Sequence, residues 1–125
     1  MNANVSLVIQ VLGGPAVTAA WTLSADGFDR ISTLCAKGAT THVLLGPGVP
    51  KVVVLYSSAY PDAANAAKLT FKFAGSAKAQ NFVEPIALVS QSVTTATSTD
   101  YTSVDINNTL AADVTVDCYM LRNAV

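Results

Sequence analysis

The single histidine, His42, limits any acid–base chemistry that this chain can perform. A Ser-His-Asp or Cys-His pair must recruit it, because the chain has no other imidazole. No serine occupies a Gly-x-Ser-x-Gly turn, and neither cysteine stands in a nucleophile motif. His42 lies between Thr41 and Val43, just ahead of a Gly/Pro-rich segment, where a surface histidine needs no catalytic explanation. The sequence therefore points away from an enzyme.

The two cysteines, Cys35 and Cys118, are far apart in the sequence. In a reducing compartment we expect two free, buried thiols that behave as small hydrophobic side chains. A disulfide between them is the alternative. A metal site is a third reading, but two cysteines and one histidine supply at most three ligands with no close pair.

The eight acidic residues offer no clear pair for general acid–base work. Most fall at turns or at outward strand positions, where a solvated carboxylate is ordinary. Residues 26–29 (Asp-Gly-Phe-Asp) suggest a calcium loop but lack its regular oxygen spacing. No phosphate-cradling or dinucleotide glycine motif occurs. We therefore predict no catalytic, cofactor-binding or metal-binding residues, and no cofactor.

The composition favours a surface covered by other protein. Only 12% of the residues are charged while 51% are hydrophobic, and the chain holds 20 Ala, 16 Val and 13 Thr. A typical domain carries about 25% charged residues. The net charge of −1 comes with no basic stripe, so we expect no nucleic-acid partner. No continuous apolar run is long enough for a membrane span. Contact with neighbouring protein is the remaining explanation for the low share of charged residues.

Alternation of apolar and polar side chains is the clearest local pattern, and it predicts β-strands. Residues 4–11 place Val5, Leu7, Ile9 and Val11 on one face. Gly, Pro and Asn turns separate the segments, including a turn candidate at residues 107–109. The predicted strands are residues 4–11, 17–23, 30–36, 41–45, 51–58, 68–73, 82–90, 101–106 and 114–121.

Little of the chain shows helical periodicity. Residues 60–67 are the only plausible helical turn, residues 46–50 read as a loop because of their two prolines, and residues 91–99 read as a loop or edge. These last two segments are our candidate contact loops. We predict that residues 1–125 form one all-β domain, a single antiparallel β-sandwich or barrel, jelly-roll-like, of about eight strands.

Four aromatic side chains raise a sugar-binding hypothesis. Trp21, Tyr56, Tyr60 and Tyr101 could form a stacking platform of the kind found on carbohydrate-binding modules. The competing interpretation places Trp21 and the phenylalanines in the core and the tyrosines at its margins. The chain has few aromatic residues, so this second interpretation is favoured.

The second half of the chain resembles small structural proteins of tailed bacteriophages. The resemblance lies in residues 51–56 (Lys-Val-Val-Val-Leu-Tyr), residues 68–76 (Lys-Leu-Thr-Phe-Lys-Phe-Ala-Gly-Ser), and residues 107–109 leading into residues 113–116. Residues 51–121 are similar to capsid decoration or cement proteins and to tail-associated β-sandwich proteins of that class. That class has no shared active site, so the resemblance implies no functional residues.

The resemblance implies a non-enzymatic structural protein of a phage virion, with a capsid decoration or cement subunit that stabilises the head as the first expectation. A tail or neck protein is the close alternative, and a carbohydrate-binding module is the alternative from another class. The expected partners are other virion proteins, in particular the major capsid protein, and further copies of the chain in a homo-oligomer. Residues 1–12 read as a strand and not as a signal peptide, so we expect synthesis in the host cytoplasm and residence in the virion.

Overall fold

The structure, a computed structural model, describes residues 2–46 and 49–123. Strands dominate these residues, and two short helical segments lie between them. The helical segments are the 3₁₀ helix η1 (Ala63–Lys68) and the α-helix α1 (Gln91–Thr97). The strands are β1 (Asn2–Gln10), β2 (Ala16–Ser24), β3 (Gly27–Cys35), β4 (Ala39–Leu44), β5 (Val49–Ser57), β6 (Leu69–Phe73), β7 (Gln80–Asn81), β8 (Ile86–Leu88), β9 (Ser103–Asn108) and β10 (Val114–Asn123).

Strands β3 to β10 form two antiparallel sheets, in the orders β3-β10-β5-β8 and β4-β9-β6-β7. The pairing is nested: β6 pairs with β7, β5 with β8, β4 with β9 and β3 with β10. Such nesting describes one long antiparallel hairpin rolled so that successive strand pairs fall in opposite sheets, which is the jelly-roll arrangement. The prediction of an all-β, jelly-roll-like sandwich is confirmed. The barrel alternative is wrong, because the two sheets do not close on each other.

The core lies between these two sheets, where the alternating residues of each strand face inward. In β6, Leu69, Phe71 and Phe73 are buried, and Lys68 and Lys72 point away from the core. Leu55 of β5, in the facing sheet, and Ile106 of β9, the register partner of Phe71 in the same sheet, are fully buried as well. The rings of Phe71 and Phe73 meet edge to face, 5.8 Å apart. The alternation predicted for residues 68–73 therefore specifies the inner face.

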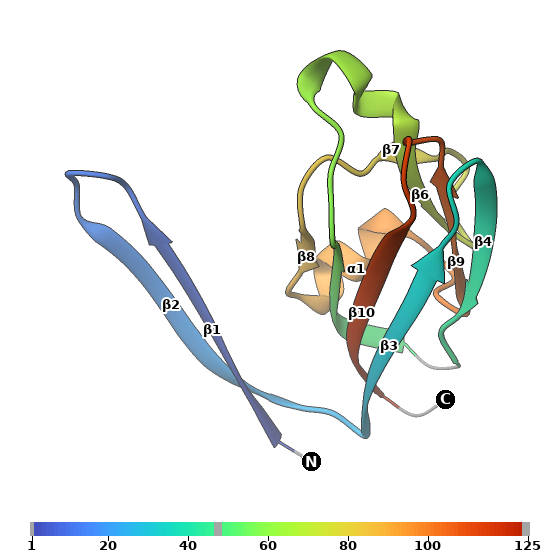
Figure 1. The fold of residues 1–125 in the computed structure, drawn as a ribbon. Helices are drawn as coiled ribbons and strands as arrows, with labels where there is room; N and C mark the ends of the chain where they lie inside the picture. The colour runs from blue at the N-terminus through green and yellow to red at the C-terminus, as the bar shows by residue number, and fades with distance from the viewer. Residues whose placement is uncertain (1, 47–48, 124–125) are drawn as a thin grey trace.

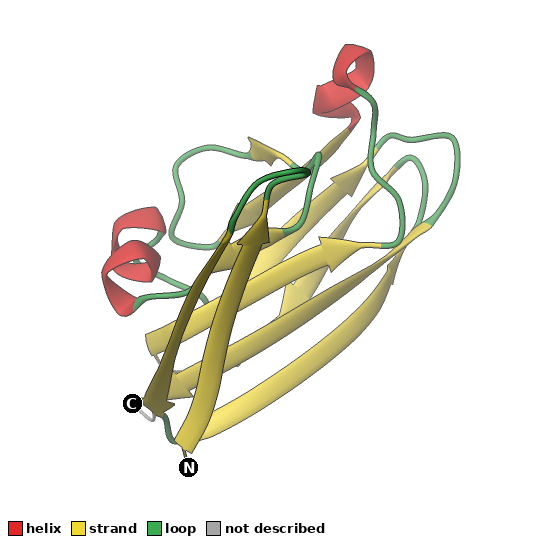
Figure 2. Cartoon of the chain, turned by 90° about the vertical axis from the view of Figure 1, so that its left-hand side faces the viewer, coloured by secondary structure: helices red, strands yellow, loops and turns green. Residues whose placement is uncertain are grey.

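Strands β1 and β2 form a separate two-stranded sheet, which we call the arm. Its register runs without a break from Asn2 opposite Ser24 to Gln10 opposite Ala16. Gly13 adopts a φ of 75° in the turn, a conformation that glycine reaches at low cost. Figure 1 shows the arm standing away from the sandwich and joined to it at one end, and Figure 2 shows the same hairpin in front of the sheets. The described residues thus hold ten strands, where about eight were predicted.

Three local predictions are wrong for identifiable reasons. Residues 46–50 do not form a loop throughout: Pro50 lies inside β5, opposite Arg122 at an irregularity in the register, where a missing amide donor is tolerated. Residues 47 and 48 lie outside the described residues. Residues 82–90 form only the short strand β8, after Pro85. The turn expected at residues 107–109 starts later, because β9 continues through Asn108.

Residues 91–97 form the helix α1 and not the loop or edge strand that their Ser/Thr content predicts. The Ser90 side chain accepts a hydrogen bond from the Val93 amide and caps the first turn. Thr94 is fully buried, and its hydroxyl donates to the Pro50 carbonyl at 2.8 Å. Capping and packing therefore override a weak helical propensity. The expected helical turn at residues 60–67 is present as η1, shifted toward Lys68.

Candidate functional site

His42 lies on the outer face of the β4-β9 pair, not in a cleft. Its Nδ1 is 2.5 Å from Oδ1 of Asp105, and both side chains are about half exposed, at 59% and 46%. Neither cysteine lies beside it, because both are buried in the core of the sandwich. An exposed ion pair of this kind contributes about 0–1 kcal/mol to stability. The contact follows from the strand register, which places His42 directly opposite Asp105 on the outer face.

Cys35 and Cys118 are free and buried, as predicted. In the register of β3 and β10, Cys35 is opposite Val114 while Cys118 is opposite Ile31. Four residues of strand, about 13 Å, therefore separate them, and a disulfide needs α-carbons within about 7 Å. Burial, and to a smaller extent Asp29, raises the pKa of Cys118 to about 11. Burial also raises the pKa of Cys35. Both are protonated at neutral pH.

The segment at residues 26–29 does not form a calcium loop. Gly27 begins β3, and the Asp29 carboxylate accepts a hydrogen bond from Nε of Arg122 at 2.6 Å. Across residues 2–46 and 49–123, no three His, Cys, Asp or Glu side chains gather as a metal site requires. Within the same residues no helix has the length and apolar character to cross a membrane.

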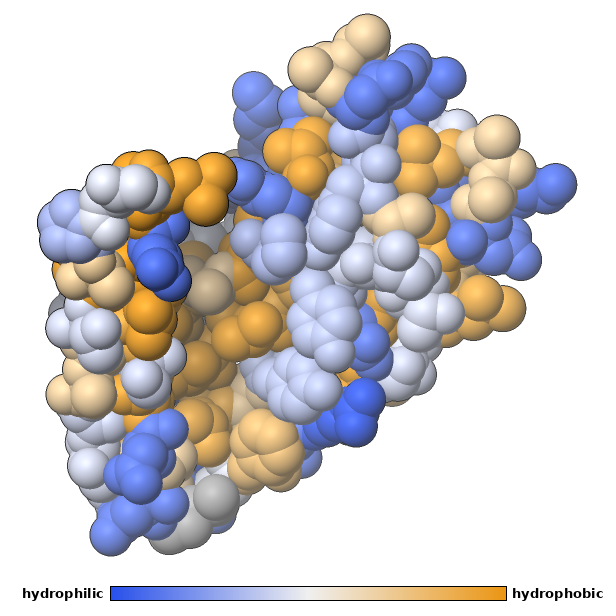
Figure 3. Space-filling model, turned by 60° about the vertical axis from the view of Figure 1, so that its left-hand side comes forward, coloured by the Kyte–Doolittle hydropathy of each residue, from blue (hydrophilic) through white to orange (hydrophobic). Residues whose placement is uncertain are grey.

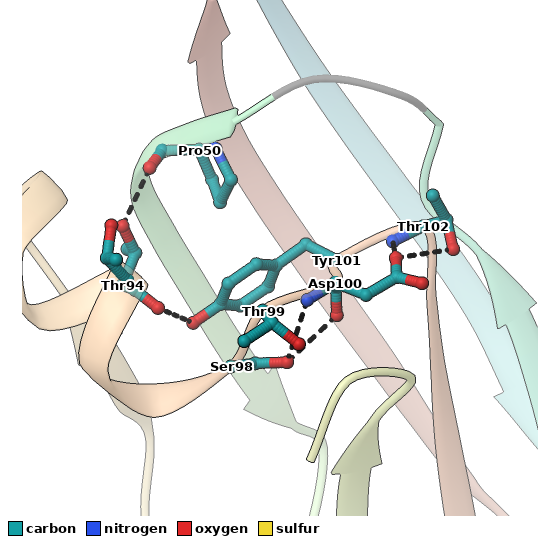
Figure 4. A pocket seen from close by; sticks show the side chains of 8 residues that line it. Pro50, Thr94, Ser98, Thr99, Asp100, Tyr101 and Thr102 are labelled. Carbon is teal, nitrogen blue, oxygen red and sulfur yellow. Dashed lines mark hydrogen bonds between the residues drawn. The ribbon is translucent and has the colours of Figure 1, made fainter.

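A pocket of about 360 Å³ lies between the start of β5, α1 and the segment that leads into β9. Figure 4 shows Pro50 and Thr94 at one side and residues 98–102 at the other. The two candidate contact loops of the sequence therefore meet here, since residues 46–50 and 91–99 both contribute to the lining.

Several polar groups of this pocket are paired with one another. Tyr101 donates its hydroxyl hydrogen to the Thr94 carbonyl at 2.6 Å, and Ser98 donates to the Asp100 carbonyl at 2.9 Å. The Asp100 carboxylate accepts from both the amide and the hydroxyl of Thr102, and these two bonds hold the pKa of Asp100 below its usual value. Asp100 is therefore ionised at neutral pH and is not a proton donor. These bonds order the loop.

The four aromatic residues proposed as a sugar platform do not come together. Tyr101 is buried, and the Tyr60 ring packs edge to face against Phe82, 5.5 Å away. Trp21 lies on the arm, and only Tyr56 of the four faces outward from the β3-β10-β5-β8 sheet. The interpretation that put Trp21 in the core is wrong as well, because the arm stands outside the sandwich.

Tyr56 instead joins a row of aromatic side chains across the outer face of the β3-β10-β5-β8 sheet. Its ring stacks on Tyr119 at 5.9 Å, and Tyr119 lies 6.1 Å from the ring of Phe28. The Arg30 guanidinium lies 5.3 Å above Tyr119. The hydrogen bond between the two phenols raises the pKa of Tyr56 to about 12. With two aliphatic neighbours these side chains form the outer patch, which we define as Phe28, Val54, Tyr56, Tyr119 and Leu121.

The arm has one apolar face and one uncharged polar face. The register places apolar residues opposite apolar residues on the first face: Ala3, Val5, Leu7, Ile9, Val17, Ala19, Trp21 and Leu23. The exposed fractions of Leu7, Ile9 and Val17 are 42%, 54% and 63%. Residues 1–25 contain no charged side chain at all, so every charge of the chain lies beyond the arm. Exposed apolar surface of this kind marks an interaction site.

The arm and the outer patch form the two walls of an open hollow. Figure 3 shows apolar side chains on the side of the arm that faces the sandwich and on the sandwich across from it. Sequence reasoning identified the apolar face of residues 4–11 but placed this strand with all the others in one β domain. The absence of charge across residues 1–25 is the signal that distinguishes the arm from the other strands. Comparison with family models, with curated proteins and with solved structures finds no match for this chain.

Proposed function

We propose that this protein is a non-enzymatic structural protein of a phage virion, a decoration or cement subunit on the head. The observation that carries the proposal is the arm, an uncharged hairpin with an exposed apolar face that stands off the sandwich. An isolated two-stranded hairpin is marginally stable in water, so such an arm gains its stability from a neighbouring protein. An assembly protein needs such a surface more than it needs a pocket.

Two further observations support this role. The jelly roll is an architecture that viral capsid domains use, although lectins and other binding proteins use it too, so the fold adds weight only by analogy. The paired polar groups of the pocket make a stiff loop beside α1, and a stiff loop is suited to contact with a second protein. A tail or neck location would use the same features.

The experiment is to locate the protein in particles from the culture that produces it. Virus-sized particles are separated by density, their peptides are identified by mass spectrometry, and an antibody carrying gold particles marks the protein under the electron microscope. We expect peptides of this chain in the particle band and gold over the head. Gold confined to the tail would select the tail or neck role. A chain found only in the soluble fraction would contradict the proposal.

The carbohydrate-binding alternative is favoured by one observation, the stacked row of Tyr56, Tyr119 and Phe28 on an outer sheet face. Flat aromatic rows of this kind stack against sugar rings. The test is a titration of the tyrosine and tryptophan fluorescence of the protein with a panel of glycans. Saturable quenching that Tyr119→Ala abolishes would support this role, and a flat response across the panel would remove it.

A further inference from the structure

We propose that the partner of the arm is a second copy of this chain, and that the apolar face of the arm lies on the outer patch of that copy. Each copy then gives its own arm and receives one. The inference rests on the proposed function in one respect, namely that the arm is an element of assembly. It goes beyond that function by naming both the partner and the surface that the arm contacts.

The first argument is that the arm is held away from its own sandwich. The carbonyl of Ser24 accepts a hydrogen bond from Nζ of Lys51, and the amide of Asp26 donates to the carbonyl of Arg122 at 2.9 Å. Ala25 between them is buried, with an exposed fraction of 2%. These contacts pin the base of the arm to the ends of β5 and β10. With its base held in this way the arm stands off its own outer patch, and contact with a second copy leaves both hydrogen bonds in place.

The second argument is chemical complementarity between the two surfaces. The arm is uncharged and apolar on one face, and the outer patch is a preformed aromatic and aliphatic surface with one cation, Arg30, lying over the Tyr119 ring. The exposed fraction of Phe28 is 50%. The phenol oxygens of Tyr56 and Tyr119 already share a hydrogen bond at 3.3 Å, so an apolar cover leaves neither phenol without a partner.

A buried carboxylate oxygen of Asp117, beside the patch, also disfavours any covering protein that carries negative charge. Oδ1 of Asp117 is the one buried side-chain oxygen without a hydrogen-bond partner among residues 2–46 and 49–123. Asp117 is opposite Tyr56 in the register of β10 and β5. The arm carries amide and hydroxyl donors and no carboxylate. A second arm over this position brings no like charge toward the Asp117 carboxylate.

The third argument is the size of the contact. The nine paired residues of each strand make an arm about 30 Å long and about 10 Å wide, so one face covers about 300 Å². A single arm on a patch buries about 600 Å² when both surfaces are counted, which is below the range of stable specific interfaces. Two exchanged arms bury about 1,200 Å², which reaches that range. Reciprocal exchange is therefore the arrangement that these dimensions support.

The experiment measures the absolute mass of the purified full-length protein by light scattering behind a sizing column, for the wild type and four variants. Leu7→Asp places a charge on the apolar face of the arm, and Val8→Asp places the same charge on the polar face one residue away. Phe28→Asp alters the outer patch, and Leu44→Asp alters an exposed leucine of the opposite sheet. We expect an oligomer for the wild type, Val8→Asp and Leu44→Asp, and a 12.9 kDa monomer for Leu7→Asp and Phe28→Asp.

A second measurement distinguishes exchange between copies from closure within one copy. A photo-crosslinking amino acid replaces Leu7, unlabelled and ¹⁵N-labelled protein are mixed, and the crosslinked peptides are mapped by mass spectrometry. We expect peptides of β3, β5 or β10 joined to the arm, with mixed isotope pairs present. Crosslinks within one chain only, crosslinks to other strands, or a monomeric wild type would overturn the inference. No virus particle enters either measurement, so failure of the virion role and failure of arm exchange are separate outcomes.

Discussion

Ile106 and Ile9 occupy similar places in two strands of this molecule, one in β9 of the sandwich and the other in β1 of the arm. Both point to the apolar face of their strand, yet their exposed fractions are 0% and 54%. The alternation around them is the same, and the difference is whether a second layer covers the face. A strand pattern therefore specifies which face is apolar, while the partner of that face is a separate property. In the sandwich the chain supplies its own partner, and in the arm it does not.

Replacing each of the two isoleucines by alanine should give the largest difference in stability between the sandwich and the arm. Ile106→Ala leaves a cavity in a packed core, and we expect it to lower the free energy of unfolding by about 2–5 kcal/mol. Ile9→Ala is expected to change it by less than about 0.5 kcal/mol at protein concentrations low enough to keep copies apart. Urea unfolding followed by circular dichroism measures both. Equal losses from the two changes would show that the arm is packed as tightly as the core.

Two asparagines make a second matched pair. The amide of Asn108 is fully buried and donates to the carbonyls of Cys35 and Ala112, each at 3.0 Å, while its oxygen accepts from the Leu110 amide. Asn108→Ala leaves these groups unpaired and should cost about 3 kcal/mol. Asn4 of the arm accepts one exposed hydrogen bond from Thr22. Asn4→Ala should cost a few tenths of a kcal/mol in the same assay, and a large loss there would contradict the comparison.

The pH dependence of stability should come from the sandwich. The raised pKa of Cys118, about 11, means that the folded state holds this proton more tightly than the unfolded chain does. The contribution of Cys118 is therefore complete below its unfolded pKa and is lost as the pH rises through about 11. The loss approaches about 3 kcal/mol. Unfolding curves at pH 8, 9.5 and 11 measure it. Cys118→Ala should flatten this part of the profile, and an unchanged profile would assign the effect to other groups.

Deletion of residues 2–24 should have the smallest effect on the sandwich. The arm makes few contacts with strands β3 to β10 beyond its base, so we expect the shortened chain to unfold cooperatively, with a free energy of unfolding within about 1 kcal/mol of the full chain. The measurement is again urea unfolding, with the solution mass as a second reading. A shortened chain that is unfolded would show that the arm belongs to the fold.

Patterns within single segments predicted much of this structure. Alternation in residues 4–11 and 68–73 placed two strands and their apolar faces correctly. The turn between the predicted strands 30–36 and 41–45 is present, with Gly38 at a φ of 73°. Features that depend on distant contacts were missed. Helix α1 needs the Pro50 carbonyl as a hydrogen-bond acceptor, and Pro50 itself sits in β5 because of an irregularity opposite Arg122. No local pattern contains that information.

The sequence predicted only part of the candidate site, again because local patterns can be recognised in it and contacts between distant segments cannot. The low charge of the chain predicted contact surfaces, which stays a prediction, and the two contact-loop candidates both contribute residues to one pocket. The outer patch was not identified, because Phe28, Tyr56 and Tyr119 are brought together only by the pairing of β3, β5 and β10. Residues from three distant segments have no signature in a linear sequence.

The nested strand pairing has a consequence for the order of events during synthesis. The arm is built from neighbouring residues and emerges first, and an isolated hairpin forms in about 1–10 μs. The outer patch needs β10, the last strand, which pairs with β3 across nearly the whole sandwich and so closes late. Each new chain can therefore form and re-form its hairpin before it has a complete patch of its own. Under the proposed exchange of arms, the first complete patch that a new arm meets would belong to an older copy, and the oligomer would grow by addition to completed molecules.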